Sequence, residues 1–396
     1  MRAALAISWS MLWFVATMVP ARAQEPELRA SSPVEVHGFV SQGFIKTTEN
    51  NYLGESERGT FEFTEVGLNF TKALSEELRV GVQLFARDIG PLGNYQPQFD
   101  WFYLDYRFAD WLGLRAGRTK LPFGLYNETS DVDAARVPIL LPQSMYTIQN
   151  REWLLAQTGA ELYGLVPLGA AGDLEYRLYG GTIFLDTSNS AAALREFDVP
   201  YMAGARLSWM PIDGLTFGGS AQFLRFDLDA VPTDAERDQY AAANLLPADY
   251  DGSISYRVPI KLWAASFEYQ WRELSFATEY VHAYVDSETS LLTPTVQSES
   301  DGFYAMASYR VRPWFTPGVY YSRARSDFTH RSGKAEYQND VALTLRYDLH
   351  AHWLLKLEGH YMHGTGALSP ELNDGKPREA MEEDWAALLI KTTAYF

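Results

Sequence analysis

The chain has 396 residues, of which 47% are hydrophobic, 14% aromatic and 21% charged, and its formal net charge is −17. This composition is too apolar and too aromatic for a disordered chain, and the absence of cysteine excludes a disulfide scaffold, a cysteine nucleophile and a thiolate metal site. The acidic balance argues against nucleic acid as a partner, because phosphate binding needs a basic surface.

The first segment has the features of a secretory signal peptide. Residues 3–19 form an uncharged, mostly apolar run, and Ala21-Arg22-Ala23 matches the small-x-small pattern of a signal-peptidase site. The alternative is a membrane-anchoring helix, but the run is shorter than the roughly 20 residues that a span needs, and Pro20 interrupts it. We therefore predict that residues 1–23 are removed and that residues 24–33 form a short periplasmic segment.

From residue 34 onward the hydrophobic residues recur with a period of two. In residues 78–87, Leu, Val and Ala side chains alternate with Arg79, Gln83 and Arg87, as in a strand with one apolar and one polar face. Such runs are about ten residues long, which is the length that a tilted strand needs to cross a membrane. The pattern predicts sixteen strands, near residues 34–46, 60–72, 78–89, 98–108, 112–119, 157–167, 173–185, 200–210, 215–227, 258–270, 274–286, 302–311, 314–325, 339–348, 353–363 and 384–396.

The predicted connections alternate between short turns and longer polar loops. Short periplasmic turns and long outer loops are typical of an outer-membrane barrel, and an even number of strands brings both chain ends to the periplasmic side. Closure of the sheet also leaves no unpaired strand edge in lipid. We therefore predict an all-β fold, a transmembrane antiparallel β-barrel of residues 34–396 in the outer membrane of a Gram-negative bacterium. The long loops are 47–59, 120–156, 186–199, 228–257, 287–301, 326–338 and 364–383.

A large secreted β-sandwich is the alternative for a chain of alternating strands. That fold gives no reason for loops to alternate between short and long. Tryptophans near the predicted strand ends, among them Trp111, Trp271 and Trp353, suit the aromatic girdles of a membrane barrel. The last strand ends in Phe396, which resembles the C-terminal signature by which bacterial outer-membrane proteins are recognised for assembly.

The string Gly117-Arg118-Thr119-Lys120-Leu121-Pro122-Phe123-Gly124-Leu125 ends one predicted strand and opens the longest loop. It resembles the strand-to-loop junction of the phosphate-selective porin O/P family. The resemblance implies a sixteen-stranded porin, usually trimeric, whose third loop folds into the lumen. Many members of that family are not phosphate channels, so the resemblance leaves the solute open.

The longest loop, residues 120–156, is the predicted pore constriction. Its prolines and the apolar residues between Val137 and Ile148 favour an ordered segment that packs against a barrel wall. If the loop folds inward, its charges face basic residues of the wall, namely Arg79, Arg87, Arg115 and Lys120. The resulting transverse field favours small hydrophilic solutes. The residues assigned to the constriction are Arg115, Lys120, Asp131, Asp133 and Arg136.

Strand parity assigns further charged residues to the lumen. The assigned pore-lining residues are Arg79, Arg87, Asp105, Arg107, Arg177, Arg206, Arg310, Arg346 and Lys356. This set leans basic, whereas the outer loops lean acidic. The net negative charge is therefore a property of the loops and does not by itself predict a cation-selective pore.

These features predict a porin that gives passive diffusion of small hydrophilic solutes and ions through a water-filled pore. The alternative is a channel specific for phosphate or another anion, and a barrel hydrolase is a third possibility. The chain contains no G-x-S-x-G or H-E-x-x-H motif and its histidines are scattered, so we expect no enzymatic activity, catalytic residue, metal or cofactor. The expected partners are solutes, ions, outer-membrane lipid and lipopolysaccharide. A homotrimer is implied by the family resemblance alone.

Overall fold

The computed structural model describes residues 33–184, 194–326 and 333–396. The predicted signal peptide and almost all of the predicted periplasmic segment 24–33 lie outside these residues. No helix in the described ranges is both long and apolar enough to cross a membrane.

Within the described residues, seventeen strands form one antiparallel sheet. Their bounds are β1 (Glu35–Thr47), β2 (Phe63–Ala73), β3 (Leu78–Ile89), β4 (Gln98–Ala109), β5 (Leu112–Lys120), β6 (Ala156–Pro167), β7 (Asp173–Thr182), β8 (Leu194–Asp198), β9 (Met202–Ile212), β10 (Leu215–Ala230), β11 (Ile254–Trp271), β12 (Leu274–Thr289), β13 (Val296–Tyr309), β14 (Phe315–Ser326), β15 (Tyr337–His350), β16 (Trp353–Gly364) and β17 (Asp384–Tyr395). The helices are α1 (Arg151–Leu154) and α2 (Asp234–Ala242), and the short 3-10 helices are η1 (Asn127–Thr129), η2 (Asp133–Ala135), η3 (Ile148–Asn150), η4 (Gly169–Ala171), η5 (Lys334–Glu336), η6 (Glu371–Asn373) and η7 (Arg378–Ala380).

The sheet closes into a barrel of sixteen strands. β1 pairs with β2 on one side and with β17 on the other, so the first and last strands complete the ring. β8 is not one of these sixteen strands. The strand β9 pairs with Leu215–Leu224 of β10, whereas β8 pairs only with Asp227–Ala230 at the end of β10. The sixteen-strand prediction is therefore confirmed. β8 falls within the predicted loop 186–199, where a short charged strand gives no alternating pattern.

The outer wall of the barrel is apolar. On β4 four consecutive outward side chains are exposed, whereas Asp105 between them is buried inside. Exposed tryptophans gather at the end of the barrel where the short turns lie, which is the placement of an interfacial aromatic girdle. The fold is therefore that of an integral outer-membrane β-barrel. The outward residues of β4 are Phe102, Leu104, Tyr106 and Phe108, and the tryptophans are Trp111, Trp271, Trp314 and Trp353.

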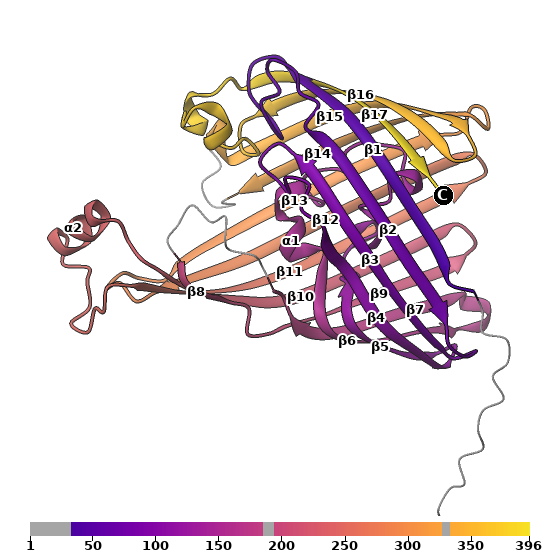
Figure 1. The fold of residues 1–396 in the computed structure, drawn as a ribbon, viewed down its shortest axis with the longest axis horizontal. Helices are drawn as coiled ribbons and strands as arrows, with labels where there is room; N and C mark the ends of the chain where they lie inside the picture. Colours follow the sequence, from indigo (N-terminus) through magenta and orange to yellow (C-terminus); the bar gives the residue numbers. More distant parts are fainter. Residues whose placement is uncertain (1–32, 185–193, 327–332) are drawn as a thin grey trace, which may run out of the picture.

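The sixteen strands of the ring differ strongly in length, from nine residues in β5 to eighteen in β11. The upper parts of the long strands β10 to β12 continue past the barrel, and α2 lies at their far end, as Figure 1 shows at the left. The side chain of Thr233 accepts a hydrogen bond from the backbone N–H of Glu236, and Glu236 accepts one in return, so a capping box begins α2.

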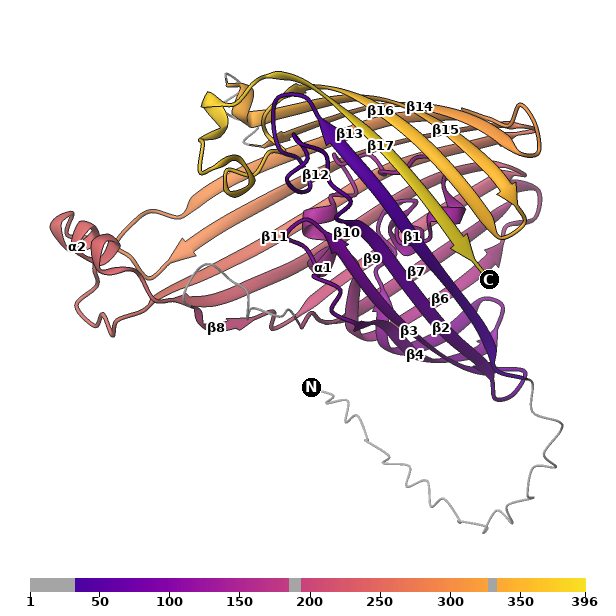
Figure 2. The same cartoon turned by 45° about the horizontal axis from the view of Figure 1, so that its top comes forward.

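The hydrophobic core lies inside the barrel. The connection between β5 and β6, residues 121–155, is called here the crossing segment, and its apolar side chains pack against inward side chains of the wall. One cluster joins Phe123 and Met145 to Tyr304 of β13, and the other joins Ile139 to Leu389 of β17. α1, within this segment, is seen inside the ring of strands in both views (Figures 1 and 2).

Candidate functional site: the crossing segment and its anchors

The crossing segment begins where β5 ends and is fixed first to that side of the barrel. The ammonium group of Lys120 donates a hydrogen bond to the carboxylate of Asp131, and the amide of Gln83 on β3 donates to the same carboxylate at 2.7 Å. Burial alone would raise the pKa of Asp131, but the charges of Lys120 and Arg151 outweigh it and hold the pKa well below its usual range. Asp131 therefore stays ionised.

Two residues further on, the segment reaches β16 and β17. The carboxylate of Asp133 lies 2.9 Å from the Lys356 ammonium and 3.5 Å from the Lys391 ammonium, and it accepts a hydrogen bond from Thr393 at 2.7 Å. Burial would raise the pKa of Asp133, but Lys356 and Lys391 lower it far more. Lys391 also pairs with Glu65 on β2, so this anchor joins the segment to three strands.

The backbone of the segment is held on the same side of the barrel. The N–H groups of Ile139 and Leu140 donate to the two carboxylate oxygens of Glu358 at 2.7 and 2.9 Å. The guanidinium group of Arg346 donates to the carbonyl oxygens of Ala134 and Arg136 at 2.8 and 2.9 Å. Charged partners strengthen such bonds, so residues 134–140 are fixed against β15 and β16.

Glu128 anchors the segment to strands β7 and β9. Its two carboxylate oxygens lie 2.9 Å from the guanidinium group of Arg177 and 3.1 Å from that of Arg206. Burial would raise the pKa of Glu128, but the two arginines outweigh it and lower the pKa. Glu175 pairs with Arg206 as well, at 2.9 Å.

Strands β11 to β14 hold the segment through hydroxyl groups. The phenol of Tyr146 donates to the buried carboxylate of Glu279, and its oxygen accepts the backbone N–H groups of Leu125 and Tyr126 at 2.9 and 3.0 Å. Burial and the charge of Glu279 raise the pKa of Tyr146 well above its usual value, so the phenol stays protonated. Ser144 and Ser322 on β14 share a hydrogen bond of 2.9 Å.

The inner wall from β3 to β7 carries a row of alternating charges. Arg79, Asp105, Arg115, Glu161 and Arg177 follow one another on neighbouring strands, with successive contacts of 3.0, 3.4, 3.4 and 2.7 Å. Each arginine therefore has a carboxylate beside it, and the row presents hydrogen-bonding side chains with little net charge. The aromatic rings of Tyr103 and Tyr163 lie under the guanidinium groups of the row.

The predicted constriction residues occupy three different places. Asp131 pairs with Lys120, one of the four wall residues that the loop charges were expected to face, whereas Asp133 lies against β16 and β17 with Arg136 beside it, at 3.8 Å. Arg115 contacts Asp105 and Glu161 of the wall. The expected single field between an acidic loop and a basic wall therefore differs from the observed arrangement, in which opposite charges are joined in buried pairs.

The predicted pore-lining residues form three groups: Arg79 and Asp105 belong to the row of paired charges, others contact the crossing segment, and two lie near the barrel end. Arg87 donates to the carbonyl oxygen of Ile148 at 3.5 Å, and Arg177, Arg206, Arg346 and Lys356 hold the segment as described. Arg107 is exposed near the short-turn end of β4. Arg310 is exposed in the turn after β13, outside the strand to which the sequence assigned it.

Sequence reasoning missed several anchors, among them Lys391, Glu279, Glu128 and the role of Glu358. The alternation of β17 could have revealed Lys391. Because Leu388 and Ile390 face outward, the next residue, Lys391, must face the lumen. Leu389 also faces inward, however, where it packs against the segment. The inward face of β17 therefore carries apolar as well as polar residues, and the sequence pattern did not identify it as the lumenal face.

Cavities lie on both sides of the crossing segment. A cavity of about 310 Å³ on the long-loop side is lined by Ser144, Met145 and Tyr337 among others. A cavity of about 210 Å³ on the other side is lined by Val132 and by Phe396 at the chain end. These two cavities share no lining residue among those described, so the segment separates them. Within the described ranges, no group of three or more His, Asp or Glu side chains is placed to hold a metal ion.

A closed sixteen-stranded barrel whose longest connection lies inside the lumen has the architecture of the outer-membrane porins. The chain is similar to the OmpT outer-membrane protein of Vibrio cholerae in a trimer form (12% identity, TM-score 0.55, 92% of this chain and 99% of that chain covered). It is also similar to an anion-selective porin from Comamonas acidovorans (11%, 0.57, 92% and 99%) and to the outer-membrane channel DcaP of Acinetobacter baumannii (15%, 0.53, 92% and 97%). No protein-family model and no curated protein matches the chain, so its membership of the phosphate-selective porin O/P family stays a prediction.

Proposed function

We propose that the protein is a non-enzymatic outer-membrane channel for passive diffusion of small hydrophilic solutes and ions, with residues 120–156 as its constriction. The observation that carries this proposal is the anchoring of the crossing segment to opposite walls, through Glu128 on the side of β7 and β9 and through Asp133 on the side of β16 and β17. Because the segment is fixed on both sides, it narrows the lumen at one fixed level along the barrel axis. Only solutes that fit between it and the wall pass.

The proposed route follows the wall of paired charges from β3 to β7. Arg79 keeps 49% and Glu175 keeps 31% of the side chain exposed, so this part of the lumen is in contact with water. Side chains that carry both signs replace part of the hydration of a polar solute, whereas an apolar solute gains nothing there. We propose a homotrimer as the assembled form, which the family resemblance and the trimer form of the Vibrio cholerae protein support.

An anion-specific channel is the second candidate. The arginines of the wall and the likeness to a porin described as anion-selective favour it. The carboxylates beside those arginines reduce the positive potential along the route, which favours the general channel. The reversal potential under a KCl gradient, with and without phosphate, separates the two candidates.

The primary test is single-channel conductance of the refolded mature chain in a planar bilayer. We expect stable openings in steps of three, with a conductance that follows the bulk conductivity of the salt. A correctly folded barrel that gives no conductance would overturn the channel proposal.

A disulfide tests whether the crossing segment stays in place during conduction. The chain has no cysteine, so the pair Ser144→Cys and Ser322→Cys, whose hydroxyl groups lie 2.9 Å apart, introduces the only two thiols. We expect oxidation to join them without changing the conductance, because the segment is already held there. Each single variant is the control, and a conductance that oxidation abolishes would show that the segment must move for solutes to pass.

A further inference from the structure

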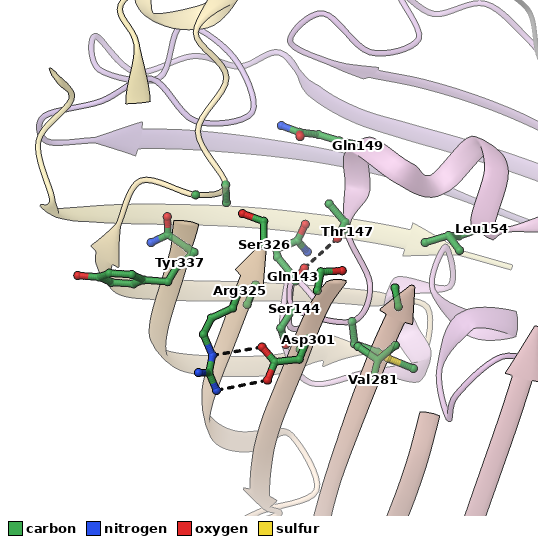
Figure 3. A pocket seen from close by; sticks show the side chains of 18 of the residues that line it. Gln143, Ser144, Thr147, Gln149, Leu154, Val281, Asp301, Arg325, Ser326 and Tyr337 are labelled. Carbon is green, nitrogen blue, oxygen red and sulfur yellow. Dashed lines mark hydrogen bonds and ion pairs between the residues drawn. The ribbon is translucent and has the colours of Figure 1, made fainter. Parts of the chain in front are cut away.

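The cavity of about 310 Å³ above the crossing segment is open to the long loops and has a mixed lining. Figure 3 shows it from close by, with Ser144, Thr147 and Leu154 of the crossing segment on one side and side chains of the wall on the other. Figure 3 also shows Tyr337 at one end of the cavity. A solute that enters from outside meets this cavity before it reaches the constriction.

One part of the lining is apolar and belongs to rigid elements. Leu262 of β11 is buried, and Val281 and Ala283 of β12 lie beside it in the core cluster that Phe123 and Met145 complete. These side chains offer a surface for a short hydrocarbon or aromatic group, and burial of such a group is favourable.

A second part of the lining offers hydrogen-bond acceptors. Gln338 of β15 is only 7% exposed, and its amide nitrogen donates to the carbonyl oxygen of Asn339 at 3.2 Å. Its side-chain oxygen is buried and accepts no hydrogen bond from the described residues. A buried acceptor without a donor is unfavourable. A hydrogen bond that a ligand donates to this oxygen therefore contributes more binding free energy than one to an acceptor that already has a partner. The ligand must therefore carry N–H or O–H groups.

The charges around the cavity favour a cation. The carboxylate of Asp301 and the guanidinium group of Arg325 face each other in the cavity wall at 3.2 and 3.3 Å, so this pair adds no net charge (Figure 3). The other charged residue of the lining is Glu336. Two loops that contribute to the cavity mouth are acidic: residues 48–62 contain four acidic side chains and one arginine, and residues 365–383 contain five and two basic ones.

We propose that this cavity is a binding site for a small organic cation, whose ammonium or guanidinium group donates to Gln338 near Glu336 and whose apolar part packs against Leu262 and Val281. The acidic loops concentrate such a cation at the mouth, and the site holds it above the constriction. The inference deepens the proposed function and rests on it, because it names the solute class that this channel retains.

The test uses three small molecules of the same shape and different charge. Phenethylamine, 2-phenylethanol and phenylacetate are titrated into the refolded full chain in detergent, and binding is measured by calorimetry without any conductance. We expect phenethylamine to bind about tenfold more tightly than the alcohol, because its hydrogen bond is charge-assisted, and phenylacetate not to bind. Equal binding of the amine and the alcohol, or tighter binding of the acid, would overturn the proposal.

Variants separate the site from adventitious binding. Gln338→Leu removes the buried acceptor and should lower the affinity for phenethylamine about tenfold. Val281→Trp fills the cavity and should abolish the binding of phenethylamine. Val319→Trp places the same side chain on the outer face of β14, where Val319 is 48% exposed, and should leave binding unchanged. Unchanged affinity in a folded Val281→Trp chain would place the amine elsewhere and end the proposal.

The two proposals fail independently. A chain that conducts ions but does not bind phenethylamine keeps the channel and loses the cation site. A chain that binds phenethylamine in the predicted order but does not conduct keeps the site and loses the channel.

Discussion

Asp133 and Lys356 form an ion pair of 2.9 Å in which both side chains are completely buried. Lys356 also donates to the backbone carbonyl oxygens of Asp133 and Pro138, at 2.7 and 3.3 Å. One ammonium group of the wall thus holds both ends of the stretch 133–138. A buried charge that loses its counter-charge is strongly unfavourable, so this pair controls how firmly the segment is attached to β16 and β17.

Asp133→Asn should therefore loosen the crossing segment. The substitution leaves Lys356 without its carboxylate and Lys391 with Glu65 alone, and we expect a loss of about 3–5 kcal/mol in the free energy of unfolding. The conductance should rise and become noisy as the stretch 133–138 leaves the wall. Urea unfolding of the barrel in lipid vesicles and single-channel recording measure the two effects. Asp374→Asn, in an exposed outer loop, is the control, and equal behaviour of both variants would contradict the anchoring role.

The anchors also predict how the channel responds to acid. The pKa values of Glu128, Asp131 and Asp133 lie below those of free carboxyl groups, so their contribution to stability is fully present above about pH 4. It is lost as the pH falls further, through the pKa values of the folded protein. We expect constant conductance from pH 8 to pH 5 and release of the segment only in stronger acid. A change between pH 8 and pH 5 that Asp133→Asn abolishes would count against this account.

The sequence predicted the barrel because the membrane imposes a simple pattern on it. A strand between lipid and lumen must alternate, and each predicted strand is present with its ends within six residues of the prediction. The alternation of apolar and polar residues weakens where a strand extends beyond the membrane, because both faces of the strand are then in contact with water. This explains why β11 begins at Ile254, four residues before the prediction, and why β8 was missed.

The site was harder to predict because it depends on the path of one segment through the lumen. Asp131 and Lys120 are only eleven positions apart at the base of the loop, and the sequence placed both in the constriction without pairing them. Asp133 and Lys356 are 223 positions apart, and nothing local shows that a loop from β5 reaches β16. Glu279 gave no signal either, because a buried anchor has the same place in the strand pattern as a glutamate that faces water.

Glu128 should influence the ion selectivity. Its carboxylate lies between Arg177 and Arg206, which keep their pairs with Glu161 and Glu175 when it is removed. Glu128→Gln therefore adds one net positive charge to the lumen while the wall stays in place, and the reversal potential under a KCl gradient should shift toward anions.

Glu371→Gln is the matched control for Glu128→Gln. Glu371 is exposed in a long outer loop, where salt screens its charge over about 10 Å. The reversal potential of the Glu371→Gln channel should stay near that of the parent chain. An equal shift in both variants would mean that the outer loops set the selectivity and that the lumenal pairs do not.

Tyr146 tests a different anchor, the contact between the crossing segment and Glu279 of β12. Its phenol donates to Glu279 and accepts the backbone N–H of Tyr126 at 3.0 Å, so Tyr146→Phe removes one donor from a buried carboxylate and leaves a buried N–H without an acceptor. We expect a loss of about 1–3 kcal/mol in the free energy of unfolding, measured in urea. Tyr106→Phe, on the outer wall, should change it little. Because the segment keeps its anchors at Asp131 and Asp133, the conductance of Tyr146→Phe should change less than that of Asp133→Asn, and the reverse order would make Glu279 the principal anchor.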